Sequence, residues 1–431
     1  MDIAVVGTGY VGLVTGTCLA ETGCRVICVD TDIKKLDLLK NGIIPIYEPG
    51  LEPLFKRAFS QKRLSFTSKL DEAASFAQII FLALPTPPKE SGAADLSRVL
   101  SVSENLAQNI KTKKIIVNKS TVPVGTTMQA QKIFKKYGSP SVVVSNPEFL
   151  REGFAVEDFM KPDRIVVGTT DSEAREILER LYQPFVRQGN PIYFMSEESA
   201  ELTKYAANSF LAMKISFMNE MARMAEKCGA DIDDVRLAVG ADERIGRRFL
   251  FPGIGFGGSC LPKDVQAITH MGRELGTPLR LAEAILEVNK TQIEFFLQKI
   301  LSHFGNNISG RKFAIWGLSF KPDTDDVREA PALKVLEFLR KHNSSFAAFD
   351  PEAFQNAKNE FPELVEMIDM YETLKGADGL IICTEWSHFR NPDFNLIKKN
   401  LKCPVVFDGR NLYRPEFMKP MGFTYYSVGR P

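Results

Sequence analysis

The segment around the cysteine at position 260, Gly255-Phe-Gly-Gly-Ser-Cys260-Leu-Pro-Lys263-Asp264, has the residue types and spacing of a nucleophilic site. Its three glycines suit a close approach of the backbone to a bulky ligand, and Pro262 suits the first turn of a following helix. A cysteine at a helix N-terminus, with Lys263 three residues on, favours the reactive thiolate. Cys260 and Asp264 share one face once the helix has begun. The segment predicts covalent catalysis by Cys260, and the alternative is a buried cysteine beside a turn.

A lysine and an asparagine form a second candidate group. Lys204 and Asn208 are four residues apart on a predicted helix, so the ammonium and the amide lie side by side. Such a pair could stabilise a developing alkoxide. The alternative is a solvated helix face.

Two further segments carry polar side chains suited to the same chemistry. Asn118-Lys-Ser120-Thr121-Val-Pro-Val-Gly125 follows a predicted strand, where ligands of α/β sheets collect. Asn146-Pro-Glu148-Phe-Leu-Arg-Glu152-Gly153 places two carboxylates four residues apart. Each segment could also be a polar turn.

Neither a catalytic histidine nor a metal site is predicted. The four histidines lie outside motif-like segments, at His270, His303, His342 and His388. No CxxC pair or Cys/His metal spacing occurs. The remaining cysteines are expected to be small buried core residues, at Cys18, Cys24, Cys28, Cys228, Cys383 and Cys403.

A glycine-rich turn at the start of the chain predicts a dinucleotide site. Gly7-Thr8-Gly9-Tyr10-Val11-Gly12 follows a predicted strand and opens a predicted helix, whose N-terminus can bind a pyrophosphate. Asp30 lies at the end of the second strand, where a carboxylate binds ribose hydroxyls and repels a 2′-phosphate. This favours NAD over NADP, although the motif alone leaves FAD open.

Elements that would position these residues alternate between strand and helix at both ends of the chain. Strands are predicted at residues 2–6, 25–29, 79–83, 115–118, 142–144 and 164–167. They return at residues 313–317, 346–350, 379–384, 405–408 and 425–428. Between them, residues 199–301 have helical periodicity, interrupted once at residues 251–260.

The predicted fold class is therefore α/β, with two doubly wound Rossmann-like domains joined by an all-helical central domain with a long connecting helix. The expected domains are residues 1–196, which carry the dinucleotide motif, residues 197–303, whose long helices suit dimerisation, and residues 304–431, which form the second α/β domain.

Composition excludes several classes of partner. The 54 basic and 53 acidic side chains give a net charge of +1, which provides no electrostatic basis for binding nucleic acid or an anionic membrane. The apolar residues 3–20 are interrupted by glycines and are interpreted as strand, turn and helix rather than a targeting segment. Seven scattered cysteines suit a reducing cytoplasm.

Taken together, these motifs resemble the UDP-glucose/GDP-mannose dehydrogenase family. The resemblance covers residues 7–12, 120–125, 146–153, 204–208, 244–246, 255–264, 320–322 and 325–328. It implies a four-electron oxidation of UDP-glucose to UDP-glucuronate by two NAD molecules in succession. In this scheme Cys260 captures the aldehyde as a thiohemiacetal, a second hydride transfer gives a thioester, and water hydrolyses it.

The resemblance also implies the role of each catalytic residue. Lys204 and Asn208 correspond to groups that stabilise the alkoxide and oxyanion, and Asp264 and Thr121 to groups that orient and activate water. Glu152 corresponds to a residue that assists hydrolysis, and Glu148 to a carboxylate near the reacting centre. The expected catalytic set is Cys260, Lys204, Asn208, Asp264, Thr121, Glu148 and Glu152.

Binding residues are implied in the same way, and the resemblance assigns UDP-sugar binding to the domain of residues 304–431. Those expected to contact NAD are Gly7, Gly9, Tyr10, Val11, Gly12, Asp30, Lys35, Pro85, Thr86, Ser120, Thr121, Glu152, Lys263 and Arg328. Those expected to contact the UDP-sugar are Glu148, Phe149, Leu150, Arg151, Glu152, Lys204, Asn208, Arg244, Phe249, Leu250, Phe256, Gly257, Lys321 and Arg410. Among these, Arg244 resembles an arginine contributed across a dimer interface, so a homodimer or higher homo-oligomer is expected.

Two alternatives remain at this point. Residues 251–254 depart from the family pattern beside the sugar site, which leaves a UDP-N-acetyl-mannosamine or GDP-mannose dehydrogenase with the same mechanism. A nucleotide-sugar sensor without catalytic activity is the other, and the retention of Cys260, Lys204, Asn208, Asp264 and Thr121 together argues against it.

Overall fold

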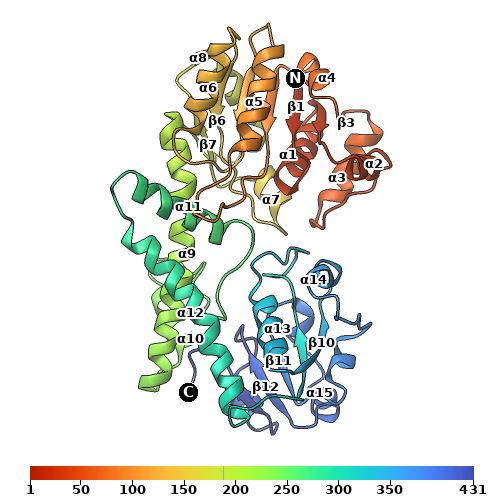
Figure 1. Cartoon of the computed structure of the whole chain (residues 1–431), viewed down its shortest axis with the longest axis vertical. Helices are drawn as coiled ribbons and strands as arrows, with labels where there is room; N and C mark the ends of the chain where they lie inside the picture. The colour runs from red at the N-terminus through yellow and green to blue at the C-terminus, as the bar shows by residue number, and fades with distance from the viewer. Residues whose placement is uncertain (188) are drawn as a thin grey trace. The chain divides into compact units, whose positions relative to one another are not determined.

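The computed structural model describes residues 1–187 and 189–431, which form two compact units. The first unit is Met1–Ala207 and the second is Asn208–Pro431. Helix α9 (Glu197–Cys228) contains the boundary, so its first turns belong to the first unit and the rest to the second (Figure 1).

The first unit is built on an eight-stranded sheet with the strand order β3-β2-β1-β4-β5-β6-β7-β8. Its strands are β1 (Asp2–Val6), β2 (Arg25–Val29), β3 (Leu64–Thr67), β4 (Ile79–Leu82), β5 (Ile115–Asn118), β6 (Val142–Ser145), β7 (Ile165–Gly168) and β8 (Ile192–Met195). Only β6 and β7 pair antiparallel, at Ser145 and Gly168, and the other neighbours are parallel.

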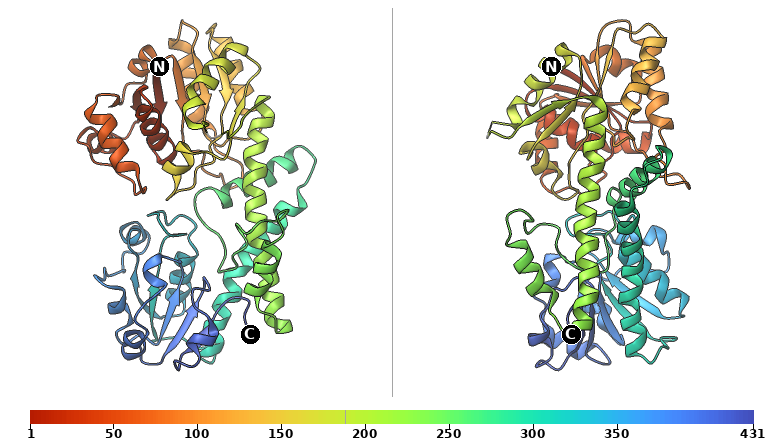
Figure 2. Two further views of the ribbon diagram at one scale, coloured as in Figure 1. Left: turned by 180° about the vertical axis from the view of Figure 1, so that it is seen from behind. Right: turned by 90° about the vertical axis from the view of Figure 1, so that its left-hand side faces the viewer.

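Helices cover both faces of this sheet, as the right-hand view of Figure 2 shows. They are α1 (Tyr10–Glu21), α2 (Ile33–Lys40), α3 (Leu51–Ser60), α4 (Leu70–Phe76), α5 (Ser97–Asn109), α6 (Thr126–Lys136), α7 (Ala155–Met160) and α8 (Ser172–Tyr182), followed by a 3-10 turn, η1 (Gln183–Phe185). Alternate residues of one strand enter different cores: Ile3 and Val5 pack with α1 and α3, whereas Ala4 and Val6 pack with α4 and α5. Strands buried on both faces lose the alternation of polar and apolar residues, which is why they appear as continuous apolar runs in the sequence.

The second unit combines helices with a parallel five-stranded sheet in the order β10-β9-β11-β12-β13. Its strands are β9 (Lys312–Trp316), β10 (Ser345–Phe349), β11 (Gly379–Ile382), β12 (Val405–Asp408) and β13 (Thr424–Tyr426). Its helices are α10 (Ile232–Gly240), α11 (Leu261–Glu274), α12 (Arg280–His303), α13 (Pro331–Lys341), α14 (Phe354–Glu360), α15 (Phe394–Asn400) and α16 (Pro415–Met418), with 3-10 turns η2 (Met370–Leu374) and η3 (Ser387–Phe389).

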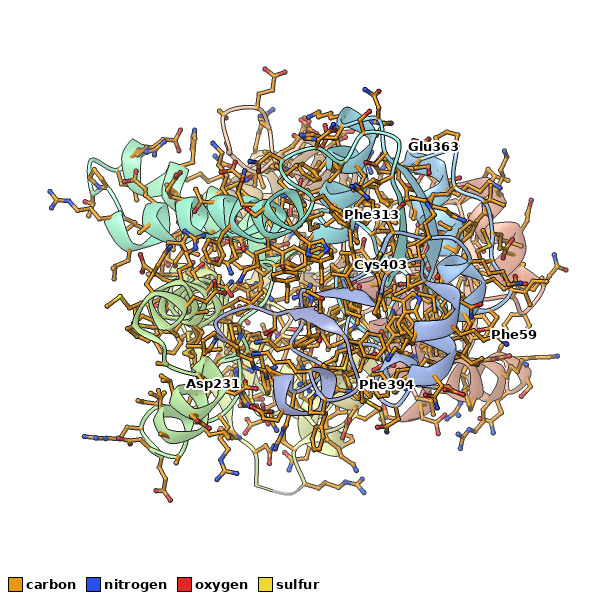
Figure 3. The ribbon with its side chains drawn as sticks, turned by 90° about the horizontal axis from the view of Figure 1, so that it is seen from below. Phe59, Asp231, Phe313, Glu363, Phe394 and Cys403 are labelled. Atoms are coloured by element: carbon orange, nitrogen blue, oxygen red, sulfur yellow. The ribbon has the colours of Figure 1, made fainter. Side chains whose placement is uncertain are left out.

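The central helices share a core with one face of the second sheet. Met218 of α9 and Phe296 of α12 lie in the same buried cluster as Phe313 of β9. The opposite face of the sheet packs in a separate cluster, against which Phe394 of α15 lies; Phe313 and Phe394 are labelled in Figure 3. The fold class is confirmed, and the three-domain division at residues 196 and 303 stays a prediction.

Three expectations about elements and burial were wrong. Strands β3 and β8 were not predicted, because both are short edge strands with partly exposed side chains. The helical segment is interrupted before α11, as expected, but also at residues 229–231 and 275–279. Each of these two additional breaks contains a glycine. Cys228 and Cys403 are exposed rather than buried, because they lie at a helix end and in a loop.

Candidate active site

Glycines at positions 7 and 12 allow the turn between β1 and α1 to pack closely, and the glycine at position 9 leaves space beside it. A Cβ atom on Gly7, whose φ is +101°, would lie 2.3 Å from the Ala83 carbonyl oxygen. One on Gly12 would lie 1.9 Å from the Gly7 carbonyl oxygen. Gly9 has nothing within 4 Å of that position, so the middle glycine borders open space. This is the geometry that a pyrophosphate needs, and it fits the predicted NAD site.

Asp30, directly after β2, is held as an ionised acceptor beside this turn. Its Oδ2 accepts a hydrogen bond from the Thr8 backbone N–H at 2.9 Å, and its Oδ1 accepts one from Asp32 N–H at 3.0 Å. Burial alone would raise the pKa of Asp30, but these bonds and the one from the Thr8 hydroxyl lower it overall. Lys35 lies on α2 with its Nζ 3.8 Å from Asp30 Oδ2. A carboxylate here suits the ribose hydroxyls of NAD.

The loops after β4 and β5 are hydrogen-bonded to each other. Ser120 Oγ accepts from Leu84 N–H and donates to the Leu84 carbonyl oxygen, both at 2.8 Å. Thr86 Oγ1 donates to the Thr121 carbonyl oxygen at 2.8 Å. Because β1, β4 and β5 are parallel neighbours, their carboxyl ends lie at one edge of the sheet. The predicted NAD contacts Pro85, Thr86, Ser120 and Thr121 therefore lie at the same edge as the glycine turn.

A buried ion pair lies after β6, within the first unit. Lys204 Nζ is 3.0 Å from Glu148 Oε1, and both side chains are almost fully buried. The other carboxylate oxygen of Glu148 accepts from the Leu150 N–H at 2.5 Å. Lys204 Nζ also lies 5.2 Å from the centre of the Phe149 ring. The structure thus brings together two of the expected catalytic residues, which are 56 positions apart in the sequence.

The rest of the 146–153 loop is fixed by carboxylates. Arg151, an expected substrate contact, has its Nε 2.9 Å from Asp158 Oδ2. Glu48, which is buried, accepts from Gly153 N–H at 2.7 Å and from Ala155 N–H at 2.8 Å. Glu152, between these two points of attachment, is half-buried. Sequence reasoning missed Glu48, because its partners lie more than a hundred residues away and no local pattern links them.

A second missed carboxylate joins α9 to the loop that follows β5. Glu201 accepts from Gly125 N–H at 2.6 Å and from Thr127 N–H and Oγ1 at 2.8 and 2.7 Å, which satisfies the N-terminus of α6. Burial raises the pKa of Glu201, although these hydrogen bonds oppose the shift. Glu201 could have been found from the sequence, because it lies three residues before Lys204 on the same face of the helix.

In the second unit, Cys260 occupies the N-cap position of α11 and is partly exposed. Its Sγ lies 3.6 Å from Ser259 Oγ. One turn later, Asp264 is fully buried, and its backbone N–H donates to the Cys260 carbonyl oxygen at 2.9 Å. The carboxylate of Asp264 accepts from Asn208 Nδ2 at 2.6 Å and from Lys263 Nζ at 2.5 Å. The predicted shared face of Cys260 and Asp264 is confirmed, and Lys263 and Asn208 hold the carboxylate in place.

The glycines before Cys260 allow close packing within the second unit, and their role in ligand binding stays a prediction. A Cβ on Gly255 would lie 2.9 Å from Asn289 Oδ1. One on Gly257 would lie 2.2 Å from the Glu329 carbonyl oxygen, and one on Gly258 would lie 2.7 Å from the Phe320 ring. The loop therefore packs directly against residues 320–329, which include the expected contacts Lys321 and Arg328.

The expected UDP-sugar residues of the second unit lie in several separate loops. Phe249 has a φ of +63°, which is strained for a side chain of this size and is typical of functional loops. Leu250 and Phe256 are buried, and Lys321 Nζ lies 5.6 Å from the Phe320 ring centre. Arg328 forms a two-point contact with Asp326, at 2.8 and 2.6 Å.

The two arginines expected to reach the substrate differ in exposure. Arg244 has a side chain that is 88% exposed and pairs with Asp242, two residues earlier. Arg410 instead binds three backbone carbonyl oxygens, those of Cys383 at 2.7 Å and of Gly255 and Phe320 at 3.3 Å each. Arg410 therefore joins the loop before Cys260 to the loops after β9 and β11.

Within residues 1–187 and 189–431, no group of three or more His, Cys, Asp or Glu residues could hold a metal ion. The histidines there have structural partners; His303 Nδ1, for example, lies 3.0 Å from the Tyr426 hydroxyl. Across the same part of the chain, no helix combines the length and the apolar character that a membrane crossing requires.

The candidate catalytic residues thus form two groups, each defined within its own unit. The first unit contains Thr121, Glu148, Glu152 and Lys204, and the second contains Asn208, Cys260 and Asp264. Lys204 and Asn208 occupy successive turns of α9.

Comparisons with known proteins cover the whole chain. The NAD-binding, central and UDP-binding domains of the UDP-glucose/GDP-mannose dehydrogenase family match residues 1–186, 198–291 and 314–415. A UDP-glucose 6-dehydrogenase of Pseudomonas aeruginosa is 44% identical over 443 residues, covering 100% of this chain and 98% of that protein. The UDP-glucose 6-dehydrogenase TuaD of Bacillus subtilis is 45% identical, covering 100% of this chain and 93% of that protein.

A solved structure agrees with these sequence matches. The UDP-glucose dehydrogenase of Pyrobaculum islandicum superposes with a TM-score of 0.92 at 37% identity, covering 100% of this chain and 98% of that one. Matches of this extent and identity, together with the dinucleotide turn, show that this chain belongs to the UDP-glucose/GDP-mannose dehydrogenase family.

Proposed function

We propose that this protein oxidises the C6 alcohol of UDP-glucose to the carboxylate of UDP-glucuronate, with NAD as the oxidant. The observation that carries the proposal is the similarity over the whole chain to enzymes named UDP-glucose 6-dehydrogenase. Oxidation of an alcohol to an acid removes four electrons, so each substrate molecule consumes two NAD and one water and yields two NADH.

The buried ion pair of the first unit suits the first oxidation. When bound at the glycine turn, NAD supplies the group that accepts hydride. Lys204 donates a hydrogen bond to the alcohol oxygen as negative charge develops on it, and Glu148, 3.0 Å away, fixes the orientation of the ammonium. The neighbouring residues Phe149, Leu150 and Arg151 contribute to the sugar site.

The cysteine of the second unit suits the second oxidation. The Cys260 thiolate adds to the aldehyde carbon and forms a thiohemiacetal, and Asn208 stabilises the oxyanion. Loss of a second hydride gives a thioester. Asp264 and Thr121 orient the water that attacks it, with assistance from Glu152, and hydrolysis releases the acid and the free thiol.

The uridine diphosphate is assigned to the loops of the second unit. Phe249 and Phe256 provide apolar surface, and the cation of Lys321 suits a diphosphate. Arg410 positions the loops that carry Gly255 and Phe320 through their carbonyl oxygens. Lys263 and Arg328 are assigned to NAD, as is Lys35 beside Asp30.

A homodimer formed through α9 is part of the proposal. Phe210, Phe217 and Met224 are each at least half exposed and are seven residues apart, so they form one apolar stripe along the helix. Leu237 of α10 and Phe251 are also more than half exposed. Exposed apolar surface of this kind is typical of protein interfaces. The exposed Arg244 is the residue that would reach the partner's substrate.

We place the reaction in the cytoplasm. All seven cysteines lie in the described part of the chain, and each is a free thiol. A reducing compartment keeps thiols in this state, as a cysteine nucleophile requires.

The substrate assignment is tested by initial rates of NADH formation with UDP-glucose, UDP-N-acetyl-mannosamine and GDP-mannose. We expect the highest kcat/KM with UDP-glucose. A higher kcat/KM with GDP-mannose or UDP-N-acetyl-mannosamine would replace the substrate but keep the mechanism. Binding of UDP-glucose without NADH formation from any of the three would identify a sensor.

A further inference from the structure

Lys119 is a buried lysine to which neither the motif nor the reaction assigns a role. It directly follows β5 and is 5% exposed. Its Nζ donates to Asn146 Oδ1 at 3.1 Å and lies 5.9 Å from the centre of the Phe159 ring. Burial of an ammonium costs free energy, so a lysine in this position needs a physical reason.

One reason is the residue that it binds. Asn146 begins the loop that leads to Glu148, and its side chain is held on three sides. Lys119 and the Tyr182 hydroxyl, at 3.1 and 2.5 Å, both donate to Oδ1, while Nδ2 donates to the Val166 carbonyl oxygen at 2.7 Å. Lys119 thereby helps to fix the start of the loop that places Glu148 against Lys204.

The second reason is charge. Lys204 and Glu148 form a close pair whose charges cancel, so Lys204 alone gives little net positive field. Lys119 lies within the electrostatic range of both: burial lowers its pKa to about 8, Glu148 opposes that shift and Lys204 adds to it. At neutral pH, Lys119 therefore remains mainly protonated. Of these three buried groups, two are cations and one is an anion.

One further charged side chain borders this group. Arg164 lies with its guanidinium carbon 3.8 Å from the centre of the Phe149 ring, and its charge is shared among Asp163, Asp158 and Glu148. Carboxylates other than Glu148 therefore also oppose the charge of Arg164, and one of them, Asp158, is paired with Arg151. Lys119 adds a further buried positive charge within electrostatic range of the Glu148–Lys204 pair.

We propose that Lys119 is a positioning residue for the oxidation, which fixes the Asn146–Glu148 segment and supplies the net positive charge that stabilises the alkoxide held by Lys204. This inference rests on the proposed function, because it assumes that Lys204 contacts the reacting oxygen. A cation in a site of low dielectric acts over several ångströms, so direct contact with the substrate is unnecessary.

The test compares neutral and charged replacements. Lys119→Met removes the charge, and we expect it to lower kcat for UDP-glucose by about tenfold, equivalent to about 1.4 kcal/mol of barrier, while KM changes less than about twofold. Lys119→Arg keeps the charge and should retain most of kcat. If Lys119→Met does not fold, Lys119→Gln removes the same charge and keeps a donor for Asn146.

Two control variants distinguish the effect of the Lys119 charge from the effects of a lysine substitution elsewhere and of a lost hydrogen bond to Asn146. Lys114 lies at the opposite end of β5, where its Nζ donates to the Ala77 carbonyl oxygen, so Lys114→Met makes the same substitution away from the site and should keep the wild-type kcat. Tyr182→Phe removes the other donor to Asn146 but no charge, and its loss of kcat should be smaller than that of Lys119→Met.

Two results would overturn the inference: a wild-type kcat for folded Lys119→Met, or an arginine variant as slow as the methionine variant. An equal loss in Tyr182→Phe would also contradict a role for the charge. Wild-type protein that forms no NADH from UDP-glucose would instead refute the proposed function, so the two failures are distinguishable.

Discussion

The Cys260 side chain has a position that suits a nucleophile and differs from that of the other cysteines. It lies at the N-terminus of α11 and is partly exposed, whereas Cys18, Cys28 and Cys383 are buried, and burial raises the pKa of each of these three thiols. A buried thiol of raised pKa is inert at neutral pH. Among the four, only Cys260 therefore combines access with a helix N-terminus.

Replacement of this thiol should stop the overall reaction. We expect Cys260→Ala to lower UDP-glucuronate formation by at least about 10³-fold, because the covalent intermediate can no longer form. Cys260→Ser should accumulate an ester that intact-protein mass spectrometry detects, since an alkoxide is a poorer leaving group than a thiolate. Cys403→Ala, at an exposed cysteine before β12, serves as the control and should keep full activity. Full turnover by Cys260→Ala would contradict covalent catalysis.

The buried ammonium of Lys119 predicts a dependence of stability on pH. Burial lowers its pKa to about 8, whereas the value in an unfolded chain is about 10.4. Between these values the folded protein binds fewer protons than the unfolded chain, so the free energy of unfolding rises with pH. This contribution is lost as pH falls through about 8.

The measurement is urea unfolding of the wild type and Lys119→Met at pH 7.5 and 9.5, at one protein concentration. The stability of the wild type relative to the variant should increase between the two pH values, by up to about 1.4 kcal/mol per pH unit. A difference that is the same at both pH values would show that Lys119 is not deprotonated in the folded protein.

At the scale of elements, loops between strands and helices are held by buried carboxylates. Glu48 satisfies two N–H groups at the start of α7, and Glu201 satisfies those at the start of α6. Both carboxylates reach the loops that carry the predicted catalytic residues Thr121 and Glu152. The rigidity of the candidate site therefore depends on residues outside the motifs.

Glu48→Ala tests this dependence. Removal of the carboxylate leaves the N–H groups of Gly153 and Ala155 without their acceptor, so we expect a loss of about 2 kcal/mol of stability and a lower kcat/KM for UDP-glucose. Glu52→Ala, on the neighbouring helix α3, removes an exposed carboxylate that pairs with Lys56 and should cost less than about 0.5 kcal/mol. Chemical denaturation and steady-state kinetics measure both. Equal stability of the two variants would refute a structural role for Glu48.

The sequence predicted those strands and helices whose residues form a recognisable pattern within the element itself. Central parallel strands such as β1, β4 and β5 are buried apolar runs and were predicted, whereas the edge strands β3 and β8 were not. Long-range contacts gave no local pattern, which is why Glu48 was missed. The glycines before Cys260 were recognised as necessary, but the atoms that require them belong to residues 289 and 320–329 of the chain itself.

At the scale of the whole molecule, the candidate catalytic residues come from both compact units. Sequence spacing predicted Cys260 with Asp264 and Lys204 with Asn208, because each pair lies on one helix. The grouping of Glu148 with Lys204 required the fold, since they are joined only through the sheet and α9. The assignment of all these residues to one reaction came from the family resemblance.

The proposed homodimer can be tested by a substitution on the exposed apolar surface of α9. Phe217→Glu places a charge in the apolar stripe of α9, so we expect light scattering to give half the mass of the wild type. Activity should also fall, because Arg244 could no longer reach a partner's substrate. Phe417→Glu, at a phenylalanine of α16 that is 66% exposed, is the matched control and should keep the wild-type mass. A monomeric wild type, or an unchanged mass for Phe217→Glu, would contradict the dimer.

The proposed reaction is the complete oxidation of the alcohol to the acid through the Cys260 thioester. The most direct measurement is the amount of NADH formed per UDP-glucose consumed, with limiting UDP-glucose and excess NAD. We expect two NADH, together with UDP-glucuronate as the product. One NADH per UDP-glucose would mean that the reaction stops at the aldehyde and would contradict the thioester step.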